Sequence, residues 1–308
     1  MAKVLTTKKV KGPVKAGKGG LALKRKGGLP DVSLPSEPTA LSKDIRDFSM
    51  LIHGEKKIGK TSLLAQEPGT LFLEFDPLQK GVSIHQRQVP DWPHFLAYIK
   101  LCEEQVAAGK FKFRNIVIDG VDLMYKYCFK WSCKQMVIEH PHDENDFGKS
   151  WNVINGNYRE AFLRLRNLPG VAIRLVCHSK WHETKTRGGG STEKLVPTLT
   201  ASAEEALVGD IDIWAAYAYD GKRHVLIVKG DERTGAGHRV DHAFRTPEGE
   251  MVEEIDMGDS PQEAYRRLVA AFENQQTYTT IEELKEQQKS KKQKQGSGKK
   301  LVLKVRRR

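Results

Sequence analysis

The sequence predicts an α/β fold built around a mostly parallel, doubly wound sheet, and three observations support this prediction. Between residues 46 and 182, short apolar runs alternate with longer segments of helical periodicity. The runs are separated by enough chain for crossover helices, which neighbouring parallel strands require. From residue 211 onward the apolar runs follow one another across short turns, so we expect antiparallel strands added at the C-terminal edge of the sheet.

The first half of the chain supplies three expected strands, the opening of a helix at residues 62–66 and two longer helices. The first of the longer helices has apolar residues at Phe95, Ile99 and Cys102, a spacing that places them on one helical face. The strands are expected at residues 48–53, 70–75 and 115–119, and the helices at residues 92–108 and 121–138.

The second half begins with another helix and strand and then changes character. A polar segment at residues 183–194 contains three consecutive glycines, and Asp220-Gly221 marks a tight hairpin between two apolar runs. The expected elements are a helix at 151–168, a strand at 171–177, short strands at 211–219, 224–229 and 240–245, and a helix at 260–274.

The net charge of the chain, +12, is concentrated at its two ends. Residues 1–28 carry nine Lys or Arg and no acid, and residues 285–308 carry eleven Lys or Arg and one Glu. The ends therefore hold +9 and +10, and the segment between them has a net charge of −7. Blocks of like charge rarely fold alone, so we expect disordered basic tails. The expected organisation is a basic arm at 1–42, one folded domain at 43–278 and a basic tail at 279–308.

A complete phosphate-binding loop pattern lies between the first expected strand and the helix that follows it. Residues 54–61 read G-E-K-K-I-G-K-T, which matches G-x-x-x-x-G-K-[ST]. The glycines let backbone N–H groups turn towards phosphate oxygens, and the helix N-terminus adds further donors. We expect Lys60 to reach the β- and γ-phosphates. The residues expected to bind the nucleotide are Gly54, Glu55, Lys56, Lys57, Ile58, Gly59, Lys60, Thr61 and Ser62.

A second member of this site is expected at the end of the strand at 115–119. That apolar strand ends in Asp119, in parallel order after the phosphate loop, so its carboxylate would lie beside a Mg²⁺ ion. The alternative is an ordinary acid that caps a turn at a strand end. The complete loop upstream favours the metal role. ATP and Mg²⁺ are therefore the expected cofactors, with Thr61 and Asp119 as the expected metal ligands.

These motifs, in this order, resemble the RecA-like P-loop NTPase core. The phosphate loop is followed by L-F-L-E-F-D, then I-V-I-D-G, then L-V-C-H-S-K and an I-V-K-G-D-E-R turn. More narrowly, the chain is similar to compact phage and bacterial ATP-binding proteins of RecA type, which include phage single-strand annealing ATPases. The resemblance covers roughly residues 46–247. It implies a Mg²⁺-dependent ATPase that acts on single-stranded DNA and forms homo-oligomers with ATP at subunit interfaces.

The resemblance also implies catalytic residues. RecA-like proteins place the carboxylate that polarises the attacking water just after the second strand, where this chain has Asp76. The family pattern usually reads acid-x-Glu, whereas this chain reads Glu74-Phe75-Asp76, so either Glu74 or Asp76 is the base. Alternation along the strand would point both carboxylates to one face. His178 matches the polar sensor of the γ-phosphate, and Lys60 and Asp119 complete the implied catalytic set.

Two further segments are implied to contact DNA or a neighbouring subunit. The polar loop at 182–194 corresponds to the segment that contacts single-stranded DNA in RecA-like filaments. Trp181 beside it would stack on a base, or else lie partly buried in the core. The turn after the strand at 224–229 corresponds to the basic element that reaches a neighbour's γ-phosphate. The implied DNA-binding residues are Lys180, Lys185, Arg187 and Lys194, and the implied trans-acting residues are Lys229 and Arg233.

The preferred function is therefore an ATP-binding and ATP-hydrolysing protein that acts on single-stranded DNA in recombination, annealing or replication. The basic tails would add nucleic-acid contacts, and a single-strand-binding protein is a further expected partner. The alternative is a nucleotide-gated accessory or loading protein for a helicase or packaging machine. A metabolic kinase or GTPase ranks last, because the sequence has no N-K-x-D guanine motif.

Two further expectations concern metal and location. Cys128 and Cys133 precede His140 and His142, but the C-x₄-C spacing inside a helix places the two thiols on different faces, which disfavours zinc. The four cysteines are sparse, and no apolar run approaches membrane length. We therefore expect a cytoplasmic protein, in the host cytoplasm if phage-encoded, with no membrane partner.

Overall fold

The chain divides into two compact units, residues 1–41 and residues 42–308. The described part of the first unit, residues 34–41, contains no helix or strand. Every helix and strand named below belongs to the second unit. The computed structural model describes residues 34–143, 146–185 and 189–297.

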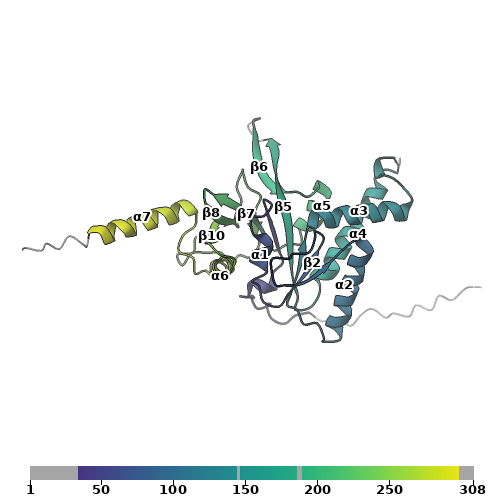
Figure 1. The fold of residues 1–308 in the computed structure, drawn as a ribbon, viewed down its shortest axis with the longest axis horizontal. Helices are drawn as coiled ribbons and strands as arrows, with labels where there is room; N and C mark the ends of the chain where they lie inside the picture. Colours follow the sequence, from purple (N-terminus) through teal and green to yellow (C-terminus); the bar gives the residue numbers. More distant parts are fainter. Residues whose placement is uncertain (1–33, 144–145, 186–188, 298–308) are drawn as a thin grey trace, which may run out of the picture. The chain divides into compact units, whose positions relative to one another are not determined.

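The second unit is built around one sheet, in which the described residues form six parallel strands with antiparallel strands at one edge (Figure 1). β1 (Met50–Gly54) lies between β5 (Ala172–Lys185) and β7 (Ile213–Asp220) and is parallel to both. This arrangement confirms the expected mostly parallel, doubly wound sheet with antiparallel strands at the C-terminal edge. Beyond β5 lie β4 (Asn115–Asp119), β2 (Thr70–Glu74) and β3 (His85–Gln88), and beyond β7 lie β8 (Arg223–Ile227) and β10 (Glu254–Asp256), with β9 (Gly237–His238) also paired to β7.

Helices cover both faces of this sheet, as a doubly wound fold requires. Successive residues of a strand point to opposite faces, so the neighbours Leu51 and Ile52 of β1 belong to two different hydrophobic cores. Both side chains are fully buried. One core is covered by α2 (Trp92–Ala107), α3 (Val121–Met136), α4 (Lys149–Arg166) and α5 (Ala201–Val208), and the other by α1 (Lys60–Leu64) and α6 (Pro261–Phe272).

The ends of several elements follow from local sequence chemistry. The Asp91 side chain accepts a hydrogen bond from the His94 backbone N–H at 2.9 Å, which caps the N-terminus of α2. Ser260 caps α6 in the same way, by accepting from the Glu263 N–H at 3.2 Å. Gly221 has a φ of 63°, as the predicted Asp220-Gly221 hairpin between β7 and β8 requires.

The expected strand at 240–245 is wrong, because these residues form a turn and bends, and only Arg245 pairs, in an isolated bridge with Met251. Val240 and Phe244 are buried, so the apolar residues that suggested a strand fill the core from a turn instead. The outermost antiparallel strand is β10, whose Ile255 pairs with Leu226 of β8. Its three residues were too short a run to be recognised in the sequence.

The segment expected to be a polar loop after residue 182 is mostly a two-stranded ribbon, which corrects that prediction. β6 (Ser191–Pro197) pairs antiparallel with the second half of β5, from Ser179 opposite Pro197 to Lys185 opposite Ser191. Figure 1 shows this ribbon projecting beyond the other strands. Trp181, Thr184, Thr192 and Val196 are residue types that favour strands, although the stretch is polar on average.

Further elements that were not expected from the sequence include β3, β9, α5 and α7 (Ile281–Ser297). α7 lies within the segment expected to be a disordered basic tail, so that expectation is wrong for residues 281–297. Ile281 is buried, and Lys285 forms an ion pair with Asp220 at 2.6 Å, so the start of α7 is attached to the β7–β8 hairpin. The basic run at 1–28 and the last residues, 298–308, lie outside the described part of the chain.

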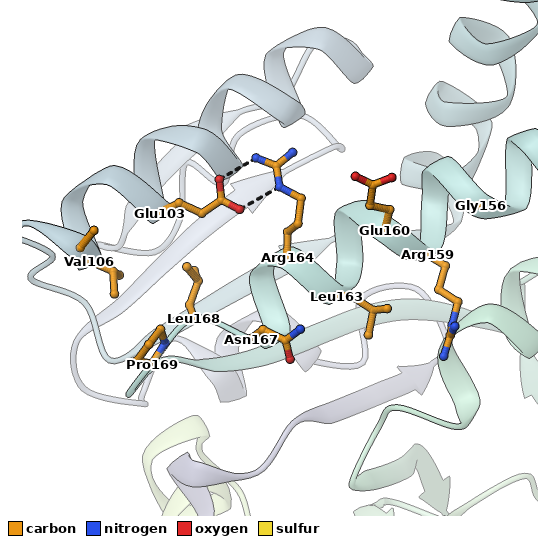
Figure 2. A pocket seen from close by; sticks show the side chains of 11 residues that line it. Glu103, Val106, Gly156, Arg159, Glu160, Leu163, Arg164, Asn167, Leu168 and Pro169 are labelled. Carbon is orange, nitrogen blue, oxygen red and sulfur yellow. Dashed lines mark hydrogen bonds and ion pairs between the residues drawn. The ribbon is translucent and has the colours of Figure 1, made fainter. Parts of the chain in front are cut away.

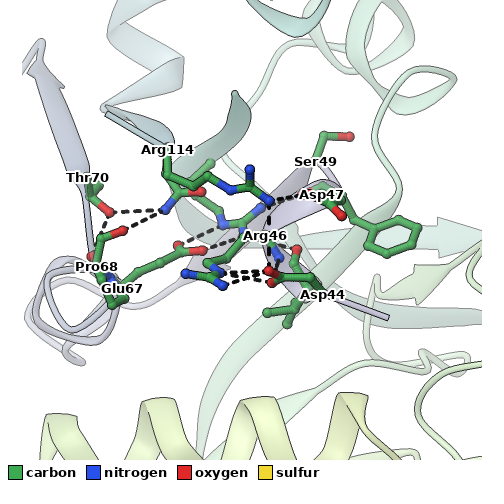
Figure 3. A network of polar contacts seen from close by, with 12 residues as sticks. Asp44, Arg46, Asp47, Ser49, Glu67, Pro68, Thr70 and Arg114 are labelled. Atoms are coloured by element: carbon green, nitrogen blue, oxygen red, sulfur yellow. Dashed lines mark hydrogen bonds and ion pairs between the residues drawn. The ribbon is translucent and has the colours of Figure 1, made fainter. Parts of the chain in front are cut away.

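A buried ion pair joins the amino-terminal edge of the sheet to the segment after α1. Arg174 of β5 and Glu67 are each 1% exposed, and two guanidinium nitrogens of Arg174 donate to the Glu67 carboxylate at 2.6 and 2.9 Å. The same guanidinium also donates to the backbone oxygens of Ile45 and Phe48. Figure 3 shows the polar network around Glu67. The interaction connects three separate segments where β1 begins.

We predict that Arg174→Met lowers the free energy of unfolding by about 3–5 kcal/mol, because it leaves the Glu67 carboxylate buried and unpaired. The control is Arg114→Met, which breaks a half-exposed pair with Asp47 and should cost at most about 1 kcal/mol. Urea unfolding of both variants measures the difference. Equal small losses would show that the buried pair is not important for stability.

Candidate phosphate-binding site

The glycine loop after β1 has the backbone conformation that its sequence suggests. Gly59 has a φ of 106° and Lys57 a φ of 66°, so the backbone turns sharply between β1 and α1. Gly54 is required for a different reason, since a Cβ there would lie 2.4 Å from the backbone oxygen of Tyr217 on β7. The close approach of β7 thus fixes where the loop begins.

The Lys60 side chain is folded back over this loop. Its Nζ donates to the backbone oxygens of Gly54 at 2.9 Å and Glu55 at 2.8 Å. Burial lowers the pKa of Lys60, while the Asp119 carboxylate opposes that shift. The ammonium group therefore lies inside the loop, where an incoming phosphate could replace the two carbonyl oxygens.

Thr61 and Asp119, the two expected metal ligands, are in direct contact. Thr61 Oγ1 donates to Asp119 Oδ2 at 2.6 Å. Burial raises the pKa of Asp119, and the Thr61 hydrogen bond works in the opposite direction. The loop and the end of β4 thus meet although β5 lies between their strands in the sheet.

Glu74 lies deeper than the sequence indicated. It pairs with Asp119 in the β2–β4 register, its side chain is fully buried, and neither carboxylate oxygen has a hydrogen-bond partner in the described structure. Burial, with smaller contributions from Asp119 and Asp76, raises the pKa of Glu74 to about 8. The carboxyl is therefore largely protonated at neutral pH in the absence of a bound ligand.

Asp76 follows β2 and is only half-buried, so it differs from Glu74 in exposure. Its Oδ2 lies 3.4 Å from the position that a Cβ on Gly120 would occupy, and Gly120 has a φ of 90°. The negative charge of Asp76 contributes to the raised pKa of both Glu74 and Asp119. Both candidate bases thus lie near Asp119, and only Asp76 has access to solvent.

His178 reaches the same edge of the sheet from β5. It lies directly opposite Gly54 in the parallel register of β1 and β5. Its Nδ1 is buried and has no hydrogen-bond partner in the described structure, and burial together with Lys60 lowers its pKa. A neutral imidazole with one free ring nitrogen suits a group that senses phosphate.

These residues fit a nucleoside triphosphate with Mg²⁺. The loop offers backbone N–H groups and the Lys60 ammonium, and the His178 Nδ1 is a buried polar atom that lacks a partner. Thr61 and Asp119 supply a hydroxyl and a carboxylate oxygen, which are ligands that Mg²⁺ prefers.

The turn expected to act in trans is ordered by its own side chains. Lys229 forms an ion pair with Glu253, so its charge is already engaged. Arg233 is exposed, and its backbone N–H donates to Asp231 Oδ1 at 2.8 Å. Within the described ranges Arg233 forms no ion pair, so of the two it is better able to reach a neighbour.

The expected DNA-binding lysines do not share one face of the ribbon. Residues directly opposite in an antiparallel pair point the same way and alternate along each strand. His182 lies opposite Lys194, which places Lys194 on the same face as Lys180. Lys185 lies on the other face, with Glu183 opposite Glu193 and with Trp181, which is 61% exposed. Arg187 lies outside the described residues.

Two residues near the site were not identified from the sequence. Asp122, in the first turn of α3, has a buried Oδ1 without a hydrogen-bond partner in the described structure, and its charge acts on Lys60, Asp119 and His178. The sequence feature that could have identified Asp122 is its position three residues after Asp119. Tyr217 contacts the loop through the packing of β7, which no local pattern indicates.

Other polar clusters and cavities lie apart from this site. Cys128 Sγ contacts Ser132 Oγ at 3.9 Å, His140 and His142 stack on each other, and the described residues contain no group of three metal-ligating side chains.

A pocket of about 640 Å³ lies between α2 and α4, beside the Glu103–Arg164 ion pair (Figure 2). None of its lining residues belongs to the phosphate site. No helix in the described ranges is long and apolar enough to cross a bilayer.

We predict that Lys60→Ala lowers ATP affinity at least about tenfold, or ~1.4 kcal/mol, while the fold remains intact. Lys60 makes its hydrogen bonds only to loop carbonyls, so its loss removes a phosphate contact and little packing. The control is Lys56→Ala, an exposed lysine of the same loop. Calorimetric titration with an ATP analogue and thermal melting test both parts. A folded Lys60→Ala variant with unchanged affinity would contradict the site.

We predict that the free energy of unfolding decreases as the pH rises from about 4.5 to about 8, because folding raises the pKa of Glu74 from about 4.5 to about 8. The folded state holds this proton where the unfolded state has lost it, so the free energy of unfolding falls as the pH rises. Glu74→Gln mimics the protonated acid and should lack this component. Urea unfolding across the interval tests it, and parallel curves for the two proteins would contradict the assignment.

Comparisons with known proteins identify the family. Residues 46–240 match the model of the AAA domain family. A curated relative, the SPbeta prophage-derived uncharacterized protein YorG of Bacillus subtilis (strain 168), is 22% identical over 168 residues, which are 53% of this chain and 51% of that protein. The chain thus spans about half the length of that relative.

A solved structure, that of the RadB recombinase, aligns with a TM-score of 0.38 and 9% identity over 70% of this chain and 89% of that one. The family match covers more than half of the chain and contains the phosphate loop, Asp119 and His178. The chain therefore belongs to the AAA domain family of P-loop nucleotide-binding proteins.

Proposed function

We propose that this protein is a Mg²⁺-dependent ATPase that acts on single-stranded nucleic acid, with DNA as the expected substrate. One observation carries the proposal: β5 runs from the phosphate site directly into the ribbon. His178 lies opposite Gly54, and Lys180, two residues later, is already on the ribbon. A single strand thus joins a nucleotide site to a surface that carries basic side chains.

The proposed chemistry divides the site residues by role. The loop and Lys60 bind and orient the phosphates, and Thr61 with Asp119 would hold Mg²⁺, which neutralises charge on the phosphate oxygens when bound. Asp76 is the proposed base that orients the attacking water, because it is exposed enough to meet solvent. Glu74 lies opposite Asp119 in the β2–β4 register, and because it is buried and protonated it is the weaker candidate for the base.

Two parts of the proposal concern partners. His182 and Lys194 lie on the ribbon face that also contains Lys180, and this face is the proposed contact with the nucleic-acid backbone. The other face, with Glu183 opposite Glu193, would repel phosphate. Arg233 is the proposed contact with the nucleotide of a neighbouring subunit in a homo-oligomer, and the basic ends of the chain would add salt-dependent affinity.

A second candidate function is favoured by the state of Glu74. If Glu74 rather than Asp76 is the base, its buried and protonated carboxyl makes it a poor one, so hydrolysis would be slow and the nucleotide would act mainly as a switch. The protein would then be a nucleotide-gated accessory or loading protein. Turnover measured with and without a single-stranded oligonucleotide distinguishes the two: stimulation supports the first function, and unchanged slow turnover supports the second.

We predict that Asp76→Asn lowers turnover at least about 100-fold with little change in ATP affinity, as expected when a general base is lost. Glu74→Gln is the matched comparison on the same strand. Steady-state kinetics and analogue binding separate the two effects. If Glu74→Gln loses turnover and Asp76→Asn does not, Glu74 is the base instead.

We predict that Lys194→Ala weakens binding of a single-stranded oligonucleotide and reduces the slope of log affinity against log salt by about 0.7. Lys185→Ala removes the same charge from the opposite, glutamate-bearing face and should change neither quantity. Fluorescence anisotropy at several salt concentrations measures both. Equal effects of the two substitutions would contradict the assignment of one binding face.

A further inference from the structure

His53, the residue before Gly54, is a buried histidine with a bond at each ring nitrogen. Its side chain is fully buried. Nδ1 lies 2.8 Å from Ser179 Oγ, and Nε2 lies 2.7 Å from the backbone oxygen of Gly235. The ring also packs edge-on against Trp214, at a centroid distance of 6.4 Å. The sequence offered no reason to single out this histidine from an apolar strand.

The partners determine which ring nitrogen carries the proton. A backbone oxygen can only accept, so Nε2 carries the hydrogen and donates it to Gly235. Nδ1 is then unprotonated and accepts from the Ser179 hydroxyl. Burial lowers the pKa of His53 to about 4, which agrees with a neutral ring. Both hydrogen-bonding groups of the imidazole are therefore used.

Each partner belongs to a different functional element. Ser179 follows His178 and is the first residue of β5 that pairs in the ribbon. Gly235 ends the turn that contains Arg233, and this turn is hydrogen-bonded to the ribbon: the Gly235 N–H donates to Leu195 O at 2.8 Å, and the Leu195 N–H donates to Arg233 O at 2.7 Å. One side chain thus connects the strand of the phosphate loop to the ribbon and to the turn.

We propose that His53 is a positioning residue that transmits occupancy of the phosphate loop to the ribbon and to the turn at 231–235. The physical cause lies next to it in the chain. Lys60 Nζ is bonded to the backbone oxygens of Gly54 and Glu55, the two residues that follow His53. A bound phosphate would draw the ammonium away and release these oxygens, so the backbone at His53 differs between the two states.

The consequence for the ribbon follows from the geometry of the imidazole. A shift of β1 at its carboxyl end moves the ring, and the ring carries Ser179 and Gly235 with it. The basic face of the ribbon and Arg233 then respond together. What the ribbon binds rests on the proposed function, but the transmission through His53 does not.

The experiment measures amide hydrogen exchange in the ribbon with and without a non-hydrolysable ATP analogue and Mg²⁺, in the absence of DNA. Ser179→Ala removes one bond to His53 and leaves the phosphate loop intact, whereas Ser179→Thr retains the hydroxyl on a residue suited to a strand. Ser191→Ala is the matched control, because Ser191 is an exposed serine at the other end of the same ribbon.

In the wild type, Ser179→Thr and Ser191→Ala, the analogue should slow exchange of the Leu195 and Thr198 amides at least about fivefold, the lower end of typical coupling. Ser179→Ala should lose most of this response while it binds the analogue as tightly as the wild type. A full response in Ser179→Ala, or no response in a wild type saturated with analogue, would overturn the proposal.

A lowered melting temperature of Ser179→Ala with an unchanged exchange response would assign His53 a purely structural role, which also overturns it. The exchange response does not require DNA, so it remains decisive if no oligonucleotide binds and the proposed function fails. Oligonucleotide anisotropy on the same four proteins tests that function separately. If DNA binds, its enhancement by the analogue should be smaller in Ser179→Ala than in the other three proteins.

Discussion

The register of the parallel strands is the constraint on which the rest of the site depends. β1 lies next to β5 with Gly54 opposite His178, and β4 lies next to β2 with Asp119 opposite Glu74. Parallel strands end at one edge of a sheet, so residues from four distant parts of the sequence meet there without any long-range motif. A one-residue shift in any pair would turn these side chains to the other face.

The same register explains why the acids of the site differ. Glu74 is inside the sheet and has no hydrogen-bond partner in the described structure, whereas Asp76, two residues further, extends past the end of β2. Burial therefore keeps one carboxyl protonated while the other is open to solvent. Asp119, which accepts a hydrogen bond from Thr61, is more exposed than Glu74 and less exposed than Asp76. This difference in burial distinguishes Glu74 from Asp76, the two candidate bases that the sequence left open.

The sequence predicted the central architecture because the core strands are short, apolar and separated by amphipathic helices. It also predicted the loop, Thr61 and Asp119, since these depend on local pattern and strand order. The ribbon was missed because Thr, Glu and Lys in alternation look polar on average, although their pairing forms a strand. β10 and the burial of Val240 and Phe244 depend on packing between distant segments. His53 and Tyr217 were missed for the same reason, because their partners are on other strands.

In the proposed function, nucleotide at the loop and nucleic acid at the ribbon are coupled through one strand, β5. The most direct measurement is the affinity of the full chain for a short single-stranded oligonucleotide in three states: without nucleotide, with ADP, and with a non-hydrolysable ATP analogue. Linkage is reciprocal, so the oligonucleotide should tighten analogue binding by the same factor. We expect the oligonucleotide to bind most tightly when the analogue is bound. Equal oligonucleotide affinity in all three states, while the analogue is bound, would contradict it.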